Sequence, residues 1–155
     1  MAFLSSMNIV GSGLTAQQLR LDVISENITN STTTRTEAGG PYRRKVVVFE
    51  AVAGRDDFRA AMARAAQAGK TASNQGYATA GGVRVTQVAE DPTPFKLVYD
   101  PTHPDADEEG YVSMPNVDTV KEVTDAMAAT QAYSANVTAL NTLKTVVQRA
   151  LEIGR

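Results

Sequence analysis

The feature that most constrains the fold is a pair of apolar stripes, one near each end of the chain, with the spacing of long α-helices. Between residues 3 and 28, apolar residues recur at alternating intervals of four and three, and Gln17 is the one polar member of the series. Such intervals place side chains on one helix face, where they pack along another helix. The pattern predicts a helix over about residues 4–28 with this apolar face: Phe3, Met7, Val10, Leu14, Leu21, Ile24 and Ile28.

A second stripe predicts a helix over about residues 117–152. Three acidic residues, Asp118, Glu122 and Asp125, crowd its first turns, where they favour the helix dipole. Gly154 stands where a helix commonly stops. The apolar face of this helix is formed by Val120, Val123, Met127, Thr130, Tyr133, Val137, Leu140, Leu143, Val147 and Leu151.

The middle of the chain has a different pattern. β-branched and aromatic residues predict strands at 42–50, 82–90 and 95–100, separated by turns rich in Pro, Asp and Gly. The Ala-rich stretch 54–81 predicts a short helix at about 56–67. We therefore expect an α+β chain in three parts: a helix over 1–30, a β-rich middle over 31–115 with a variable stretch at 51–80, and a helix over 116–155.

Composition indicates that the core is thin. The hydrophobic fraction is 43%, but aromatic residues make up only 6% and there is no Trp. Much of the apolar count is Ala, which buries little area per residue. The two stripes can pack on each other, which brings the chain ends together, or on neighbouring copies. We expect both, through an assembly interface formed by Phe3, Met7, Val10, Leu14, Leu21, Ile24, Ile28, Met127, Tyr133, Val137, Leu140, Val147 and Leu151.

The charge balance argues against a nucleic-acid-binding protein, since the net charge is −2. The charges are unevenly distributed: acidic residues concentrate between Asp91 and Asp125, and a basic cluster lies at 43–45 with few aromatics beside it for stacking on bases. Such asymmetry suits contacts between copies, although solvated faces are the commoner explanation. The candidate inter-subunit charges are Arg43, Arg44, Asp107 and Glu108.

Cysteine is absent, which excludes disulfides, thiolate metal sites and cysteine nucleophiles. No apolar run approaches the roughly 20 residues that span a bilayer. The N-terminal residues lack the basic region and continuous apolar core of a secretory signal peptide. We therefore expect a protein that does not span a membrane and that leaves the cytoplasm, if it does so, by another route.

Two segments resemble ligand-binding loops only in part. Residues 68–73 match the end of a phosphate-binding loop, but Arg64 stands where that motif needs a glycine. Residues 105–110 match the opening of a calcium loop, but position twelve is Asn116 instead of a bidentate glutamate. An exposed loop and a solvated acidic turn explain these segments better.

No catalytic or metal site is predicted. His103 is the single histidine, so a zinc site with two histidines is excluded. Ser12 lies in a Gly-Ser-Gly sequence but not in a strand–turn–helix elbow that would expose a nucleophile. We expect no enzyme activity and no cofactor.

Four segments together resemble one family, the flagellar basal-body rod proteins, and within it the FlgC-type proximal-rod branch. They are GSGLTAQQLRLDVISENITNSTTT at 11–34, PYRRKVVVF at 41–49, GVRVTQVAEDPTPFKLVYDPTHPDADEEGYVSMPNV at 82–117 and AYSANVTALNTLKTVVQRALEIGR at 132–155. The resemblance covers the chain except for about residues 51–80, and the DPTHPDADEEGYV run is its most specific part.

The resemblance implies a structural subunit of the rod that drives the bacterial flagellum. It also implies export through the flagellar type III apparatus and assembly in the periplasm, with the terminal helices forming an inner tube and the β-rich middle an outer layer. The implied partners are copies of itself, the other proximal and distal rod proteins, and the rod-export gate adaptor.

Two other classes stay open from the residues alone. One is a helical adaptor, such as a chaperone or a needle component of a secretion system, because paired apolar stripes also suit those proteins. The other is a small calcium-binding module at 105–116. Tight calcium binding would favour the module.

Overall fold

The protein is described from a computed structural model, which defines residues 2–37, 39–52 and 81–153. Two long helices, α1 (Ala2–Thr29) and α3 (Thr119–Ile153), lie before and after the strands along the chain. The strands are β1 (Lys45–Ala51), β2 (Val83–Glu90), β3 (Lys96–Tyr99) and β4 (Tyr111–Met114). The predicted α+β class, both terminal helices and the three predicted strands are confirmed. The short helix predicted at 56–67 lies outside the described residues.

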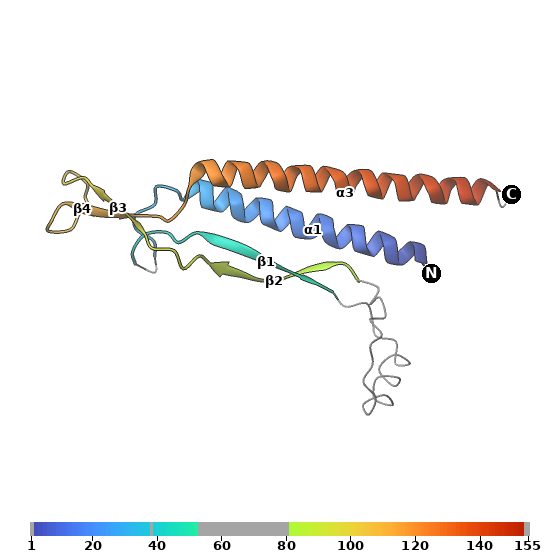
Figure 1. Cartoon of the computed structure of the whole chain (residues 1–155), viewed down its shortest axis with the longest axis horizontal. Coiled ribbons are helices and arrows are strands. Elements are labelled where there is room, and N and C mark those ends of the chain that lie inside the picture. The colour runs from blue at the N-terminus through green and yellow to red at the C-terminus, as the bar shows by residue number, and fades with distance from the viewer. Residues whose placement is uncertain (1, 38, 53–80, 154–155) are drawn as a thin grey trace, which may run out of the picture.

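The two helices run antiparallel along each other, so both chain ends lie at one end of the molecule (Figure 1). Near one end of the pair Asn27 contacts Glu122, and further along Gly13 faces Asn136. A Cβ atom at residue 13 would lie 3.1 Å from Asn136 Nδ2, so the glycine permits the close approach of α3. Since α3 has 35 residues and α1 has 28, α3 continues beyond the start of α1 (Figure 1).

Most of the predicted apolar stripe is at least half-buried along this helix pair. Ile24 is buried, and nine other members are intermediate in exposure: Met7, Val10, Leu14, Leu21, Ile28, Tyr133, Val137, Leu140 and Val147. Met127 and Leu151, in contrast, are each 70% exposed. The side chain of Phe3 is outside the described part of the structure. The stripe of α1 therefore packs mainly within the chain, whereas these members of the α3 stripe are exposed: Val120, Val123, Met127, Thr130 and Leu151.

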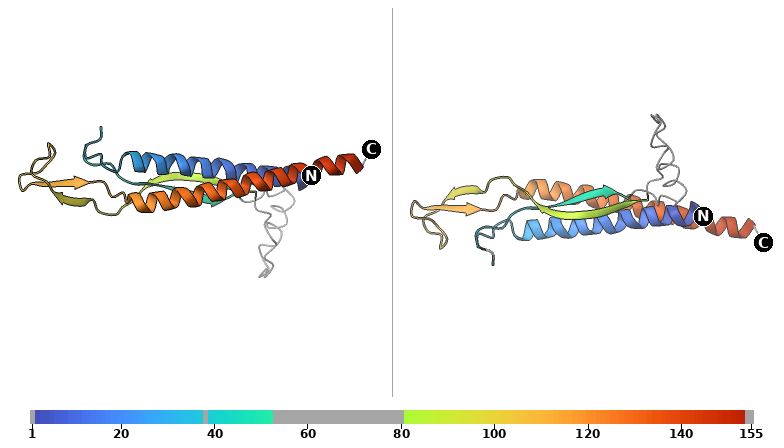
Figure 2. Two further views of the ribbon diagram at one scale, coloured as in Figure 1. Left: turned by 90° about the horizontal axis from the view of Figure 1, so that it is seen from above. Right: turned by 90° about the horizontal axis from the view of Figure 1, so that it is seen from below.

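The sheet formed by β1 and β2 lies along α1 (Figure 2). The strands are antiparallel, with a bulge between Val48 and Phe49. Exposure alternates along β1, where Lys45, Val47 and Phe49 are more buried than their neighbours. This is the period of two expected for a strand with one covered face.

The hairpin formed by β3 and β4 projects beyond the helices, at the end opposite to the chain termini (Figures 1 and 2). β4 was not predicted, because its four residues follow directly on a long turn. Val112 is buried, whereas Leu97 and Tyr99 are exposed, and the Tyr99 and Tyr111 rings meet edge to face at 5.3 Å. An isolated two-stranded hairpin is only marginally stable in water. The rest of the chain supports this hairpin at its base, where β3 begins and β4 ends.

Short polar side chains end α1 and begin α3. The Asn30 amide and the Asn30 side chain both donate to the Glu26 carbonyl, and the Ser31 amide donates to the Ile28 carbonyl at 3.2 Å, so these carbonyls of the last turn have partners. At the start of α3, Asp118 Oδ1 accepts from the Val120 amide at 3.1 Å, as an N-cap residue does. The polar run after residue 28 is therefore a capped helix end followed by a crossing to the sheet.

The core is thin, as composition predicted. Its buried apolar side chains are small apart from one tyrosine: Ala16, Val23, Ile24, Tyr42, Val112, Val117 and Ala129. Among the described residues, no helix combines the length and the apolar character needed to cross a membrane.

Candidate functional site

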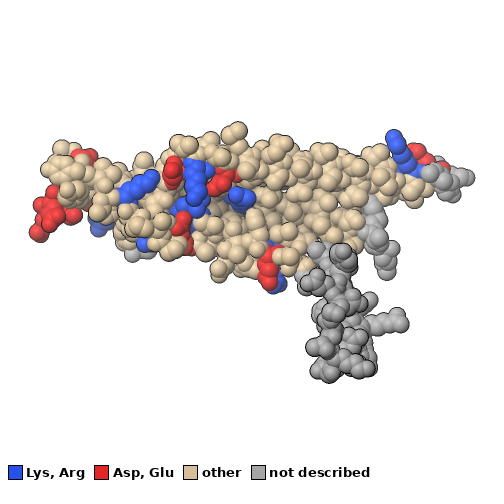
Figure 3. All heavy atoms as spheres, viewed as in Figure 1, with Lys and Arg blue, Asp and Glu red and all other residues tan. Residues whose placement is uncertain are grey.

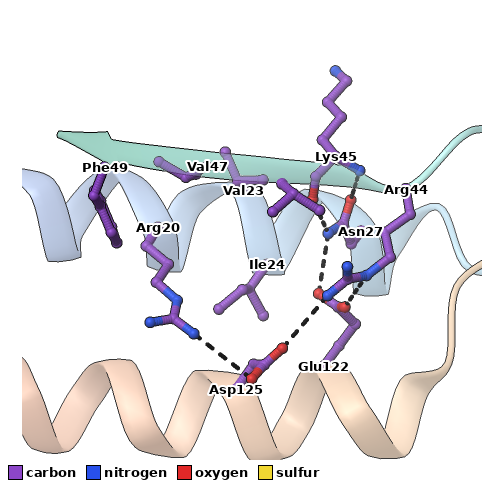
Figure 4. Close-up of a pocket in the computed structure, with 11 residues that line it drawn as sticks. Arg20, Val23, Ile24, Asn27, Arg44, Lys45, Val47, Phe49, Glu122 and Asp125 are labelled. Atoms are coloured by element: carbon purple, nitrogen blue, oxygen red, sulfur yellow. Dashed lines mark hydrogen bonds and ion pairs between the residues drawn. The ribbon is translucent and has the colours of Figure 1, made fainter. Parts of the chain in front are cut away.

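Polar side chains from three elements meet where α1 ends, β1 begins and α3 begins (Figure 4). We call this cluster the polar junction; it consists of Asn27, Tyr42, Arg44, Asn116 and Glu122. Asn27 is 1% exposed and Glu122 is 0% exposed, so both are as buried as any apolar residue of the core. Burying such groups is costly unless they are hydrogen-bonded. The junction meets that condition.

Asn27 is the centre of the junction. Its Oδ1 accepts from the Tyr42 hydroxyl and from the Lys45 amide, each at 2.9 Å. Its Nδ2 donates to the Lys45 carbonyl at 2.9 Å and to Glu122 Oε2 at 3.0 Å. One amide side chain on α1 thus satisfies the first residue of β1 and also reaches α3. Both ends of its side chain are fully used.

Arg44 neutralises the buried carboxylate. Its Nε donates to Glu122 Oε1 at 2.6 Å, so each Glu122 oxygen has a partner. Its two terminal nitrogens lie 3.3 Å from Asp91 Oδ2 and 3.4 Å from Asp125 Oδ2. A guanidinium forks well between several carboxylates, and such charge-assisted bonds are the strong ones. Arg44 therefore joins β1 to α3 and to the end of β2.

Asn116 extends the junction toward the hairpin. Its Oδ1 accepts from the Arg44 amide at 2.8 Å. Its Nδ2 donates to the carbonyls of Asp91 and Thr93, each at 3.1 Å. The segment that leaves β2 is thereby tied to the segment that enters α3.

The electrostatics follow from this packing. Burial, together with the nearby carboxylates of Glu26, Glu122 and Glu90, raises the pKa of Tyr42 to about 12. Burial opposes the charge on Arg44, but bonding to Glu122 and Asp91 outweighs burial and raises the Arg44 pKa. Hydrogen bonds from the Thr93 hydroxyl and amide lower the pKa of Asp91, with Arg44 contributing less.

The Tyr42 shift predicts a loss of stability in alkali. A phenol whose pKa is raised from 10.0 to about 12 by folding stabilises the fold fully below pH 10, and this contribution disappears as the pH rises from 10 toward 12. Tyr42→Phe should cost about 1 kcal/mol at pH 8, through the lost bond to Asn27. Its deficit relative to the parent should shrink or reverse near pH 11.5. Urea unfolding at both pH values measures this, with Tyr99→Phe as an exposed control. A deficit independent of pH would contradict the prediction.

A pocket of about 230 Å³ lies beside the junction, between α1, β1 and α3 (Figure 4). Its described lining combines apolar side chains, such as Val23 and Phe49, with charged groups that already pair within the chain. For example, Arg20 Nη2 lies 3.6 Å from Asp125 Oδ1. The lining residues include no hydroxyl, thiol or imidazole, so the pocket offers no nucleophile or general base of those types. The contacts between these lining residues hold α1, β1 and α3 together.

The residues weighed as ligands take structural positions. Asp107 Oδ1 accepts from the amides of Glu109 and Tyr111, and His103 Nδ1 accepts from the Asp105 amide, so these side chains order the turn between β3 and β4. Within residues 2–37, 39–52 and 81–153, no group of three histidine or acidic residues is arranged to hold a metal ion. The loop at 68–73 lies outside the described residues.

The four predicted inter-subunit charges differ in their surroundings. Arg44 is 13% exposed and engaged in the junction. Arg43 donates to the Asp91 carbonyl at 3.1 Å and stacks over the Phe95 ring at 4.5 Å. Asp107 and Glu108 are exposed in the turn of the projecting hairpin. Of the four, Asp107 and Glu108 are the more exposed, although the Asp107 carboxylate also accepts from two amides of the turn.

Sequence reasoning did not find the roles of Asn27 and Glu122. Glu122 was assigned to the helix dipole, and Asn27 belonged to the polar run at the end of α1. For Asn27 the one signal available was its position directly before Ile28, at the edge of the α1 stripe. Glu122 lies off the stripe predicted for α3: it precedes Ala126, Ala129 and Tyr133 at intervals of four, three and four. This face is the one that is covered, whereas the nearby members of the predicted stripe are exposed: Val120, Val123 and Met127.

Two protein families match the amino-acid sequence of this chain. The family described as flagella basal body rod protein matches residues 7–35, and the C-terminal family of the flagellar basal body rod FlgEFG proteins matches residues 108–153. These matches contain α1 with Asn27, and α3 with Glu122.

Full-length relatives extend the match. The chain is 43% identical to the flagellar basal-body rod protein FlgC of Bacillus subtilis, over 97% of both chains. It is 41% identical to FlgC of Borreliella burgdorferi, over 99% of this chain and 98% of the relative, and 41% identical to FlgC of Escherichia coli O6:H1 over 100% of both. With paired terminal helices joined through a small β-rich middle, the chain belongs to the FlgC family of flagellar basal-body rod proteins, which are structural subunits of the flagellar rod.

Proposed function

We propose that the chain assembles into the proximal rod through its terminal helices, transmits torque there and lines the export channel. Its partners are copies of itself, the other proximal and distal rod proteins, and the rod-export gate adaptor. It reaches the periplasm through the flagellar type III export apparatus. In this proposal residues 1–30 and 116–155 form the inner layer, and residues 31–115 form the outer part.

The observation that carries the proposal is an apolar surface left exposed on the helix pair. Val120, Val123 and Met127 follow one another at helical spacing on α3, and all three are exposed. Leu151 is exposed where α3 continues beyond α1, and Leu4 and Ile9 are exposed on α1. Exposed apolar side chains grouped in this way mark interaction sites. The thin core makes burial of this surface by neighbours the more valuable.

The distribution of charge supports the part of this surface that contains Leu4, Ile9 and Met127. No Asp, Glu, Lys or Arg occurs between residues 2 and 19 of α1 or between residues 126 and 143 of α3. On the face shown in Figure 3, charged atoms gather at the two ends and along the sheet side, and the middle of the helix pair is almost free of them. Charged residues are depleted in the centres of protein interfaces, because desolvating them is costly.

The projecting hairpin supplies a second contact in this proposal. Leu97 and Tyr99 are exposed on its strands, and Asp107 and Glu108 lie in its turn. An apolar face with an acidic edge fits a neighbour that offers apolar and basic groups. The stripe residues named from the sequence remain the proposed assembly interface, with Met127 and Leu151 between subunits and the others mainly within the chain.

The test is a charge placed on the exposed stripe of α3. Val123→Lys and Met127→Lys should each leave folding within about 0.5 kcal/mol of the parent, because both sites are exposed. The double variant should abolish incorporation into the rod, since two lysines would have to be desolvated in the interface. Swimming of a strain that carries only this variant, and its recovery in isolated basal bodies, measure the effect.

The matched control is Val88→Lys on β2. Val88 is 43% exposed and Val123 is 47% exposed, so the two replacements are alike in their effect on folding. Normal swimming of the Val123→Lys/Met127→Lys double variant would remove the α3 stripe from the proposed interface. Imaging of isolated basal bodies, with this chain located in the density, then identifies the surface that is used.

A further inference from the structure

At the end of the β1–β2 sheet that precedes and follows residues 53–80, hydrogen bonds join the two strands to each other and to α1. The Val52 amide donates to the Gly82 carbonyl at 2.8 Å, and the Gly81 amide donates to the Val52 carbonyl at 2.6 Å. These bonds continue the ladder beyond Ala51 and Val83, the last paired residues of β1 and β2. The outgoing and returning chains therefore leave the fold side by side.

Ser12 fastens this closed end to the helix. Its hydroxyl accepts from the Val83 amide at 3.0 Å and donates to the Ile9 carbonyl at 2.7 Å. Val83 is the first residue of β2, and the Ser12 hydroxyl supplies the hydrogen-bond acceptor that its backbone amide needs. Ser12 was considered above as a nucleophile; the structure assigns it this contact instead.

Gly82 makes the contact sterically feasible. It is buried, and its φ is +110°, a conformation that residues with a Cβ rarely adopt. A Cβ atom at this position would overlap the Ser12 hydroxyl and approach the Ile9 Cα to 3.4 Å. Two separate requirements, backbone conformation and space, therefore both demand glycine.

We propose that Ser12, Val52, Gly81 and Gly82 form a joint, here called the root, that makes the helix pair and the β1–β2 sheet independent of the chain between residues 52 and 81. The root is a place where this rod protein accepts inserted segments of different length and sequence while the rest of the fold is kept. The cost of closing the loop grows only with the logarithm of its length, so bonds that hold the two ends together tolerate a longer insert. The proposal rests on contacts within one chain and does not depend on how subunits assemble.

The first experiment compares two glycine replacements in the full-length chain. Gly82→Ala should lower the thermal midpoint by about 5 °C or more beyond Gly39→Ala. Gly39 is the matched control, because its φ is +83° and a Cβ there would meet no atom within 4 Å. Both replacements impose a positive φ on alanine, and only Gly82→Ala meets α1. Equal thermal midpoints for the two variants would contradict the proposed root.

Ser12→Ala keeps the proposal testable if Gly82→Ala does not fold. Hydrogen exchange should then accelerate at the Val83 amide, while the Asp91 amide, which donates to the Arg44 carbonyl at the other end of the sheet, keeps its protection. Unchanged exchange at Val83 would overturn the role of Ser12.

The final experiment replaces residues 53–80 with Gly-Ser-Ser-Gly. The expected result is unchanged hydrogen-exchange protection of the amides within α1 and α3, and unchanged protection of the Val52 and Val83 amides. Loss of either would show that the fold depends on the segment and would overturn the proposal. Preserved folding supports the root whether or not cells carrying the variant swim, so its outcome is separate from that of the assembly proposal.

Discussion

Arg44→Met should destabilise the protein by about 3–5 kcal/mol, the range expected when one partner of a buried ion pair is removed. The replacement keeps most of the side-chain length and its apolar stem. It leaves Glu122, which is 0% exposed, with a negative charge and without its bond at 2.6 Å. Asp91 and Asp125 lose the same partner. Urea unfolding followed by circular dichroism measures the change.

Arg84→Met is the matched control for this result. Arg84 lies on β2 and, like Arg44, pairs with a glutamate; its Nη2 is 2.9 Å from Glu50 Oε2, but its side chain is 63% exposed. Exposed pairs contribute at most about 1 kcal/mol. Equal effects of the two arginine replacements would mean that the buried junction contributes no more than a surface pair.

A double variant separates the buried charge from the packing. Adding Glu122→Gln to Arg44→Met removes the unpaired negative charge and keeps a similar shape. It should therefore recover part of the loss, because removing both partners of a buried pair costs less than removing one. No recovery would place the effect of Arg44 in its packing.

Asn27→Asp should be the second most damaging single change, costing about 3 kcal/mol or more at pH 7. It replaces one nitrogen by an oxygen and changes almost no volume. The new oxygen would face Glu122 Oε2, which now accepts from Asn27 at 3.0 Å, and the Lys45 carbonyl, which accepts at 2.9 Å. Two donors are lost and two buried carboxylates are brought together.

The loss should shrink as the pH falls, because a proton on the introduced carboxyl restores a donor toward Glu122. Asn141→Asp, on the exposed side of α3, is the control and should change stability by about 0.5 kcal/mol or less. Urea unfolding at pH 7 and pH 5 measures both variants. A stability of Asn27→Asp equal to that of Asn141→Asp would contradict the geometry of the junction.

Both predictions concern folding, and their consequence for the rod follows from position. The junction sets the angle at which the β-rich middle leaves the helix pair, because it joins α1, β1 and α3 at one end. The proposed role in transmitting torque requires that these parts are held rigidly to one another. A network in which each buried group has a partner meets that need, because few alternative arrangements satisfy it.

The sequence by itself determined the helices and most of the strands. The stripes at 3–28 and 120–151 are long and regular, and a period near 3.6 over so many residues admits no other regular structure. Strands at 45–51 and 83–90 were marked by β-branched residues. β4 was missed because its four residues follow directly on a long turn, whose residues hide the start of the strand. The family resemblance came from the same segments and was confirmed by the full-length relatives.

Only the tertiary structure decided what the polar residues do. Glu122 belongs by sequence to an acidic first turn, yet it is buried by Asn27, which lies 95 residues earlier, and by Arg44, which lies 78 residues earlier. Ser12 and Gly82 likewise meet across 70 positions of sequence, as their numbers show. Apolar periodicity is local and can be read along the chain. Whether a polar group is exposed, or buried and paired, depends on partners that the fold alone brings into reach.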